Sequence, residues 1–149
     1  MSILQSGLAK SSADAYTIDN SLRFNPTDSP GLGRTPGSEG NRRTWTVSFW
    51  FKYASPVRSE FFSNGTDGTH EFILGTEATS GALSVKEDDG SQVYKMSTSA
   101  KHRDPSAWYH AVVAMDTTES TDTDRIKMWI NGDRVTAFNE IQWPAENLQ

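Results

Sequence analysis

The sequence predicts an all-β fold, an antiparallel sandwich of short strands, and three observations support that class. Apolar and polar residues alternate in several short segments, which is the period of a β-strand. Clusters of Gly, Asn, Asp and Ser separate these segments and are typical of turns. Ser and Thr together number 33 of the 149 residues, and no segment has the apolar pattern of a long helix. The length fits one domain, and the Trp and other aromatic residues can supply its core.

The first part of the chain predicts an arm followed by the sandwich domain. Residues 1–15 are rich in Ser, Ala and Gly, so we expect an N-terminal arm or linker, with the domain spanning residues 16–149. Residues 16–24 alternate, with a slip near Asp19 and Asn20, and predict a bulged strand. Residues 25–43 carry three Pro and four Gly and predict a long loop with a short strand at residues 32–34.

Residues 44–53 form the clearest strand of the sequence. Alternation places Trp45, Val47, Phe49 and Phe51 on one face and Trp50 on the other. A helix would separate Val47 and Phe51 from Trp45 and Phe49. This segment therefore predicts a strand whose aromatic side lies in the core.

Shorter strands follow in the middle of the chain, separated by turn clusters. The Asp89-Gly90 pair predicts a type I′ hairpin that sets Leu83 and Val85 opposite Val93 or Tyr94. The expected strands are residues 60–63, 70–75, 82–87 and 92–96.

The last third of the chain predicts a central strand and a second hairpin. Residues 108–115 are apolar on both faces, so we expect a strand that is central, between sheets or under a covering loop. A polar loop, residues 116–124, leads to a strand at 125–130. Asn131-Gly132 predicts another type I′ turn, with the chain returning through residues 134–138. The readable pattern ends at Trp143-Pro144.

Three blocks of this sequence resemble the concanavalin A-like, or laminin G-like, jelly-roll family. They are Ser21–Asn25, Trp45–Lys52, and the pair formed by Trp108–Asp116 and Arg125–Asp133. The resemblance spans roughly residues 16–140. Residues 41–45 and 103–110 look most similar to such domains in virion proteins of tailed phages, particularly tail or tail-fibre proteins of marine phages.

The resemblance implies a jelly-roll sandwich but leaves the function open, because this fold hosts lectins, adhesion modules, glucanases and structural domains. Such domains usually continue past the Asn-Gly hairpin with closing strands, and this sequence ends at Gln149. We therefore expect a sandwich that is incomplete at its C-terminal end, closes differently, or takes an edge from another chain.

Composition excludes several functional classes. Cysteine is absent, which excludes disulfides and thiolate chemistry. The N-terminus does not resemble a signal peptide, and no apolar stretch is long enough to span a membrane. The net charge is −5, and most of the excess acid falls after residue 58, so we expect no nucleic-acid binding.

No residue pattern predicts catalysis. Glucanases of this fold carry alternating acidic residues on one strand, and the acidic run Glu87-Asp88-Asp89 is expected in a turn instead. His110 is expected to have a framework role, and His70 and His102 are expected to be solvated. We therefore expect no catalytic residues and no enzymatic activity.

The candidate binding residues are two tryptophans, with a weaker cation hypothesis beside them. Trp50 and Trp129 fall on the faces of their strands opposite the core. They are candidates for stacking on sugars in a concave groove or for a subunit interface, with ordinary packing as the alternative. Asp116, Asp122 and Asp124 could supply oxygens to Ca²⁺, although a solvated acidic loop is the favoured interpretation. No other cofactor is expected.

Two functional hypotheses follow. The first is a non-enzymatic structural or attachment module of a phage virion, of tail-fibre, tail or capsid-decoration type. It would be made in the host cytoplasm, dock on other virion proteins through residues 1–15, and form a homo-oligomer. The alternative is a lectin-like domain that recognises host surface glycans, with or without Ca²⁺.

Overall fold

The computed structural model describes residues 31–53, 57–65 and 70–149, apart from the side chain of His70. The chain divides into two units, residues 1–38 and 39–149. Of the first unit, residues 31–38 are described, and they are exposed and contain no strand. The short strand predicted at residues 32–34 is therefore wrong. The predicted arm, residues 1–15, and the predicted strand at 16–24 lie outside the described residues.

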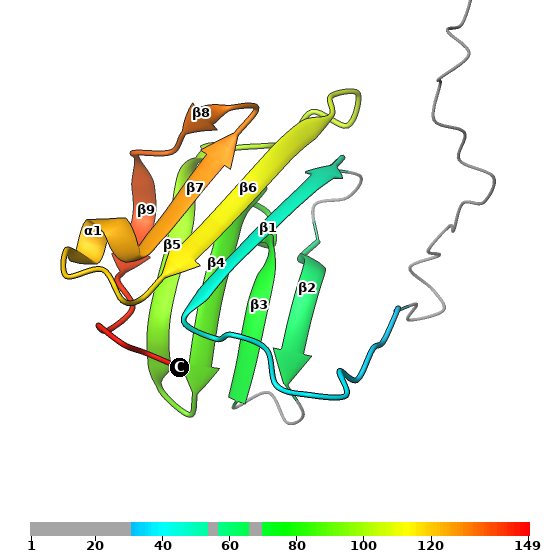
Figure 1. Cartoon of the computed structure of the whole chain (residues 1–149). Helices are drawn as coiled ribbons and strands as arrows, with labels where there is room; N and C mark the ends of the chain where they lie inside the picture. Colours follow the sequence, from blue (N-terminus) through cyan, green and yellow to red (C-terminus); the bar gives the residue numbers. More distant parts are fainter. Residues whose placement is uncertain (1–30, 54–56, 66–69) are drawn as a thin grey trace, which may run out of the picture. The chain divides into compact units, whose positions relative to one another are not determined.

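Residues 39–149 form two antiparallel β-sheets that face each other, which confirms the predicted fold class (Figure 1). The four-stranded sheet has the order β1-β6-β7-β8 and the five-stranded sheet the order β2-β3-β4-β5-β9. The first sheet comprises β1 (Thr44–Phe51), β6 (Tyr109–Asp116), β7 (Ile126–Ile130) and β8 (Asp133–Arg134). The second comprises β2 (Ser59–Gly65), β3 (His70–Thr76), β4 (Ala82–Asp89), β5 (Gln92–Lys101) and β9 (Phe138–Gln142).

The core lies between the sheets and follows the predicted alternation of β1. Trp45, Val47, Phe49 and Phe51 pack against the core, whereas Trp50 is 65% exposed. Each fully buried aliphatic side chain contributes about 2 kcal/mol by leaving water. The buried core residues are Phe51, Leu74, Leu83, Val85, Tyr94, Met96, Ala111, Val113, Met115, Ile126 and Met128.

Strand β6 is central in its sheet, as predicted, with β1 on one side and β7 on the other. Val47 pairs with Val113, and Trp50 pairs with His110 in the β1–β6 ladder. The inward side chains of β6 are buried, but its outward residue Val112 is only half-buried. The expectation that both faces of this strand are fully buried is therefore wrong for the described residues, since none of their strands forms a layer over the outer side.

The two predicted hairpins differ in accuracy. Asn131 and Gly132 have φ values of 52° and 90°, as a type I′ turn requires, so the β7–β8 turn is confirmed. The β4–β5 hairpin exists, but only Gly90 has a positive φ, of 99°. The Asp88 carboxylate accepts a hydrogen bond from the Gly90 amide at 3.0 Å. The ladder also shifts register between Glu87 and Asp88, so Val85 pairs with Met96 and not with Val93 or Tyr94.

The end of the chain departs from the sequence prediction. The return strand expected at 134–138 is limited to β8, and the chain then crosses to the other sheet as β9, which pairs with β5. Strand β9 was not predicted because Asn139, Glu140 and Gln142 interrupt its apolar pattern. The predicted polar loop contains one helical turn, α1 (Asp122–Arg125). Arg125 stabilises it by donating to the carbonyls of Glu119 and Ser120, both at 2.8 Å.

Candidate ligand-binding face

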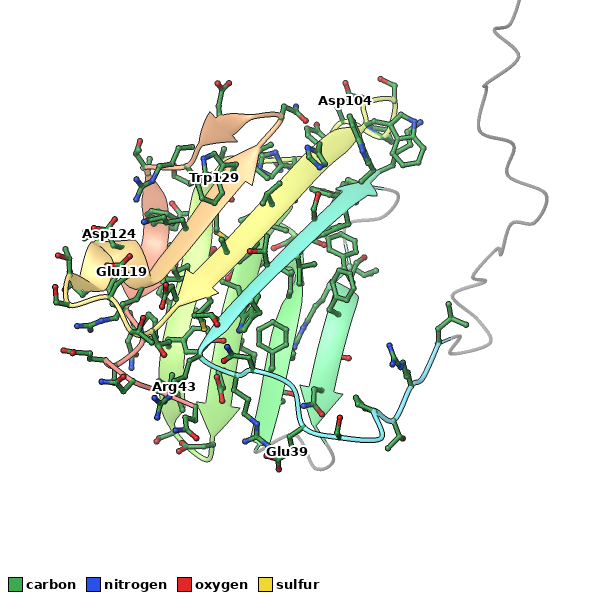
Figure 2. The ribbon with its side chains drawn as sticks, viewed as in Figure 1. Glu39, Arg43, Asp104, Glu119, Asp124 and Trp129 are labelled. Carbon is green, nitrogen blue, oxygen red and sulfur yellow. The ribbon has the colours of Figure 1, made fainter. Side chains whose placement is uncertain are left out.

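The outer face of the four-stranded sheet carries an exposed group of aromatic side chains. Alternation along β1, β6 and β7 turns every second residue away from the core. Figure 2 looks onto this surface and labels Trp129 on β7. We call it the tryptophan face and define it by Ser48, Trp50, Trp108, His110, Val112 and Trp129.

Trp50 and His110 form a stacked pair on this face. Their ring centroids lie 4.9 Å apart with planes inclined by 26°, because the two residues are directly paired in the β1–β6 ladder. Ser48 Oγ lies 2.9 Å from His110 Nε2 and fixes the imidazole ring. The outer side of the Trp50 indole remains free to meet a ligand, since the residue is 65% exposed.

Trp129 lies on the same face, as the sequence predicts, but two strands away from Trp50. It pairs with Val112 on β6 and with Arg134 on β8, and it is half-buried. Strands about 4.8 Å apart and alternate residues about 6.8 Å apart place the Trp50 and Trp129 backbones about 12 Å from each other. Two indoles at that spacing suit an extended ligand better than a single small ring.

Trp108 is a member of the face that the sequence analysis did not single out. It is 59% exposed and precedes β6 in phase with His110. The Lys52 ammonium lies 5.4 Å from its ring centroid, a cation–π contact. The signal was present in the sequence, because the alternation that sets Trp50 outward also sets Lys52 and Trp108 outward.

A loop that contains Asp104 borders the face at the end where Lys52 and Trp108 lie. Hydrogen bonds from Ser106 hold the pKa of Asp104 below its ordinary value, with a further contribution from the Lys52 charge. The Ser106 hydroxyl donates to Asp104 Oδ1 at 2.6 Å. The loop is therefore ordered by its own carboxylate and frames this edge of the tryptophan face.

The three calcium candidates do not gather around one point. Asp116 accepts from Thr118, Asp122 from the Thr123 amide, and Asp124 pairs with Lys127 at 3.0 Å. Two of them, Asp116 and Asp124, line a pocket of about 470 Å³ beside the tryptophan face. Within the described ranges, no group of three or more His, Asp or Glu side chains is arranged to hold a metal ion. Calcium binding stays a prediction of the sequence alone.

One histidine occupies a different environment from the one predicted. His102 is 6% exposed, not solvated, and packs against Phe51 and Tyr109 with ring centroids 6.2 Å and 5.0 Å away. Burial lowers the pKa of His102. His110 lies in the sheet, as expected, but it also supports the exposed Trp50. The side chain of His70 lies outside the described residues.

The acidic run Glu87-Asp88-Asp89 was expected in a turn, but it lies in β4, which extends two residues past the predicted strand 82–87. Glu87 pairs with Tyr94 and is half-buried. Burial raises the pKa of Glu87, and a hydrogen bond with Tyr94 partly offsets the effect. Glu87 continues the alternation of Leu83 and Val85, which indicates that its side chain points inward. The acidic residues and the glycine that follow it favoured a turn instead.

Sequence comparison agrees with this architecture. The family model described as the concanavalin A-like lectin/glucanases superfamily, of laminin G type, matches residues 31–147. No curated protein and no solved structure matches the chain. In the part of the chain that the structure describes, there is no helix with the length and apolar character needed to cross a membrane.

Proposed function

The chain belongs to the concanavalin A-like lectin/glucanase superfamily, and from this we propose that it is a non-catalytic recognition module that binds glycans on its tryptophan face. The observation that carries the proposal is the stacked and exposed pair of Trp50 and His110, with Trp129 on the same sheet. Flat rings bind the apolar faces of sugars, while neighbouring polar groups bind their hydroxyls. The family membership supports a binding role of this type.

The polar groups beside the indoles fit this role. Ser48 Oγ and the His110 ring can each accept or donate a hydrogen bond. Arg134, next to Trp129, is about half exposed, and its nearest carboxylate contact is 4.0 Å, to Asp124. It therefore retains donors for a ligand. An apolar surface rimmed by such groups is typical of an interaction site.

The acidic residues support binding without hydrolysis. Glycosidases place two carboxyl groups on either side of the scissile bond, about 5–10 Å apart. The described members of the tryptophan face include no carboxylate. At its border Asp124 is paired with Lys127 at 3.0 Å, and Asp116 is engaged by Thr118. These contacts favour structural roles for the two carboxylates over an acid and base pair.

Glycan-array binding by the purified chain tests the proposal. We expect Trp50→Ala and Trp129→Ala each to weaken binding at least tenfold, or about 1.4 kcal/mol, because each removes a stacking surface. Ile141→Ala, which trims an exposed apolar residue of the other sheet, is the matched control and should bind normally. An array without any bound glycan, or equal binding by all three variants, would contradict the proposal.

The setting we propose for this module is a phage virion, where it would serve as a structural or attachment protein beside other virion subunits. The sequence blocks around residues 41–45 and 103–110 favour this setting. Mass spectrometry of the purified particle provides the test. The polypeptide should be present as a stoichiometric component, and its absence from the particle would reject the virion role while leaving glycan binding intact.

A further inference from the structure

One end of the sandwich contains a pocket that is separate from the tryptophan face. Four side chains form a continuous row across the inner side of the five-stranded sheet, because Asn64 pairs with Phe72, Phe72 with Glu87, and Glu87 with Tyr94. Paired residues share a face of the sheet. The row therefore combines an amide, two aromatic rings and a carboxylate along one wall.

The facing wall comes from the four-stranded sheet and is apolar. Trp45, Val47 and Met115 line it, and Trp45 meets Phe72 edge-on with ring centroids 5.6 Å apart. The open pocket between the two walls has a volume of about 370 Å³, within the range of small-molecule sites. Asn41, Arg42, Leu148 and Gln149 complete its lining.

Glu87 is the unusual residue of this pocket. Interior positions of a sandwich are normally apolar, and a charge moved there needs compensation. The ion pairs between described side chains include Glu71 with Lys86, Glu140 with Lys95, and Asp124 with Lys127, but none includes Glu87. Burial raises the pKa of Glu87, and the hydrogen bond with Tyr94 and the charge of Arg42 offset that increase only in part.

Tyr94 satisfies only part of the carboxylate. Its residue is 1% exposed, and burial raises the pKa of its phenol so that it remains protonated and can donate to Glu87. An ionised carboxylate has about four acceptor sites, so one phenol leaves most of them available. Asp89, further along the strand, adds negative charge near Glu87.

We propose that this end pocket is a second binding site, independent of the proposed glycan binding, and that it takes a small organic cation. The ligand would carry a primary or quaternary ammonium group on an apolar body. The ammonium group would pair with Glu87, and the aromatic walls from Trp45, Phe72 and Tyr94 would cover the body and attract the charge through their ring faces.

Arg42 is expected to oppose the binding of a cation in this pocket. Its charge acts on Glu87 from the mouth of the pocket, but its side chain is 67% exposed and its closest carboxylate contact is Glu39 at 3.9 Å. An exposed guanidinium compensates a half-buried carboxylate weakly. It would instead repel an incoming ammonium group, so removal of Arg42 should strengthen cation binding.

Phenethylamine is a suitable probe, with 2-phenylethanol as its neutral analogue. We would follow the Trp45 indole NH and Tyr94 resonances by NMR while adding each compound up to about 10 mM, which populates even a weak site. Phenethylamine should shift both resonances, and its dissociation constant should be at least tenfold lower than that of 2-phenylethanol. Equal affinity of the two compounds, or no shift with phenethylamine, would overturn the proposal in the unmodified chain.

Three variants then assign the charge effect. Glu87→Gln keeps the size and the acceptor for Tyr94 and should weaken phenethylamine binding at least tenfold. Arg42→Gln should strengthen it about two- to fivefold. Glu140→Gln removes a carboxylate from an ion pair elsewhere on the same sheet and should leave binding unchanged. Unchanged binding in a folded Glu87→Gln variant would reject the site, and so would weaker binding in Arg42→Gln. None of these outcomes bears on the glycan array.

Discussion

The outer faces of the two sheets are built in contrasting ways. On the five-stranded sheet, lysines on β4 and β5 form ion pairs with glutamates on the flanking strands. Lys86 contacts Glu71, which also lies 4.0 Å from Arg58. Lys95 lies 2.6 Å from Glu140. On the four-stranded sheet the corresponding positions hold indoles, an imidazole and small residues, and the charged pairs stand at the border around Asp124.

The contrast teaches that the tryptophan face is not a requirement of the fold. Both sheets are antiparallel, and each needs only one apolar face to build the common core. The ion-paired outer face of the five-stranded sheet shows which side chains this chain places on a surface that only has to be solvated. Large exposed indoles on the other surface contribute little to folding, and this difference favours a binding role.

The largest expected effect is a loss of stability when an inner side chain of β1 is removed, compared with removal of its outer neighbour. Phe51 is 4% exposed and packs on Phe61 and Tyr109, with ring centroids 4.9 Å and 5.3 Å away. Phe51→Ala should lower the free energy of unfolding by about 3–5 kcal/mol. Trp50→Ala, next to it in sequence, should lower it by less than about 1 kcal/mol. Urea denaturation measures both, and similar losses would place Trp50 in the core.

Acid should weaken the interior through His102. Its folded-state pKa lies below its ordinary value of 6.5 because of burial, so the unfolded chain binds the proton more readily. Stability is therefore complete above pH 6.5 and falls as the pH drops toward the folded-state pKa, by up to about 1.4 kcal/mol per pH unit.

Denaturation curves from pH 7.5 to 5 measure that loss, together with those of a His102→Gln variant as control. The variant should be less sensitive to pH over this window. An identical pH dependence in both chains would show that another group is responsible.

The ion pairs on the outer face of the five-stranded sheet should contribute to stability but not to ligand binding. Lys86 and Glu71 are 23% and 22% exposed, so Lys86→Gln should lower the free energy of unfolding by about 0.5–1 kcal/mol, less in high salt. Its glycan-array profile should match the unmodified chain. A loss of glycan binding in this variant would move the binding site to the other sheet.

The smallest expected effect concerns the residue that positions His110. Ser48→Ala removes the contact between Oγ and Nε2 and frees the imidazole beneath Trp50. Glycan affinity should fall about two- to fivefold, corresponding to one modest hydrogen bond. Ser63→Ala, a serine exposed on β2, is the control and should have no effect. A stronger loss than that of Trp50→Ala would indicate that Ser48 contacts the ligand directly.

The sequence predicted the parts of the fold in which alternation and burial agree. The faces of β1 and the outward positions of Trp50 and Trp129 follow directly from that agreement. Strand β9 was missed because it pairs through its backbone while displaying mostly polar side chains. The acidic run at Glu87, placed in a turn, and His102, expected to be solvated, were misjudged because residue type suggested solvent and the ladder register decided otherwise. Register depends on distant segments, which local pattern alone does not contain.

The register of the β1–β6 pairing determines both which side chains enter the core and which form the tryptophan face. Sliding either strand by one residue would exchange inner and outer side chains along its whole length, bringing Phe49 to the surface and hiding Trp50. A chain with the wrong register would therefore lose the proposed binding surface together with its core. If glycans bind there, retention on an immobilised glycan would select for correctly folded molecules.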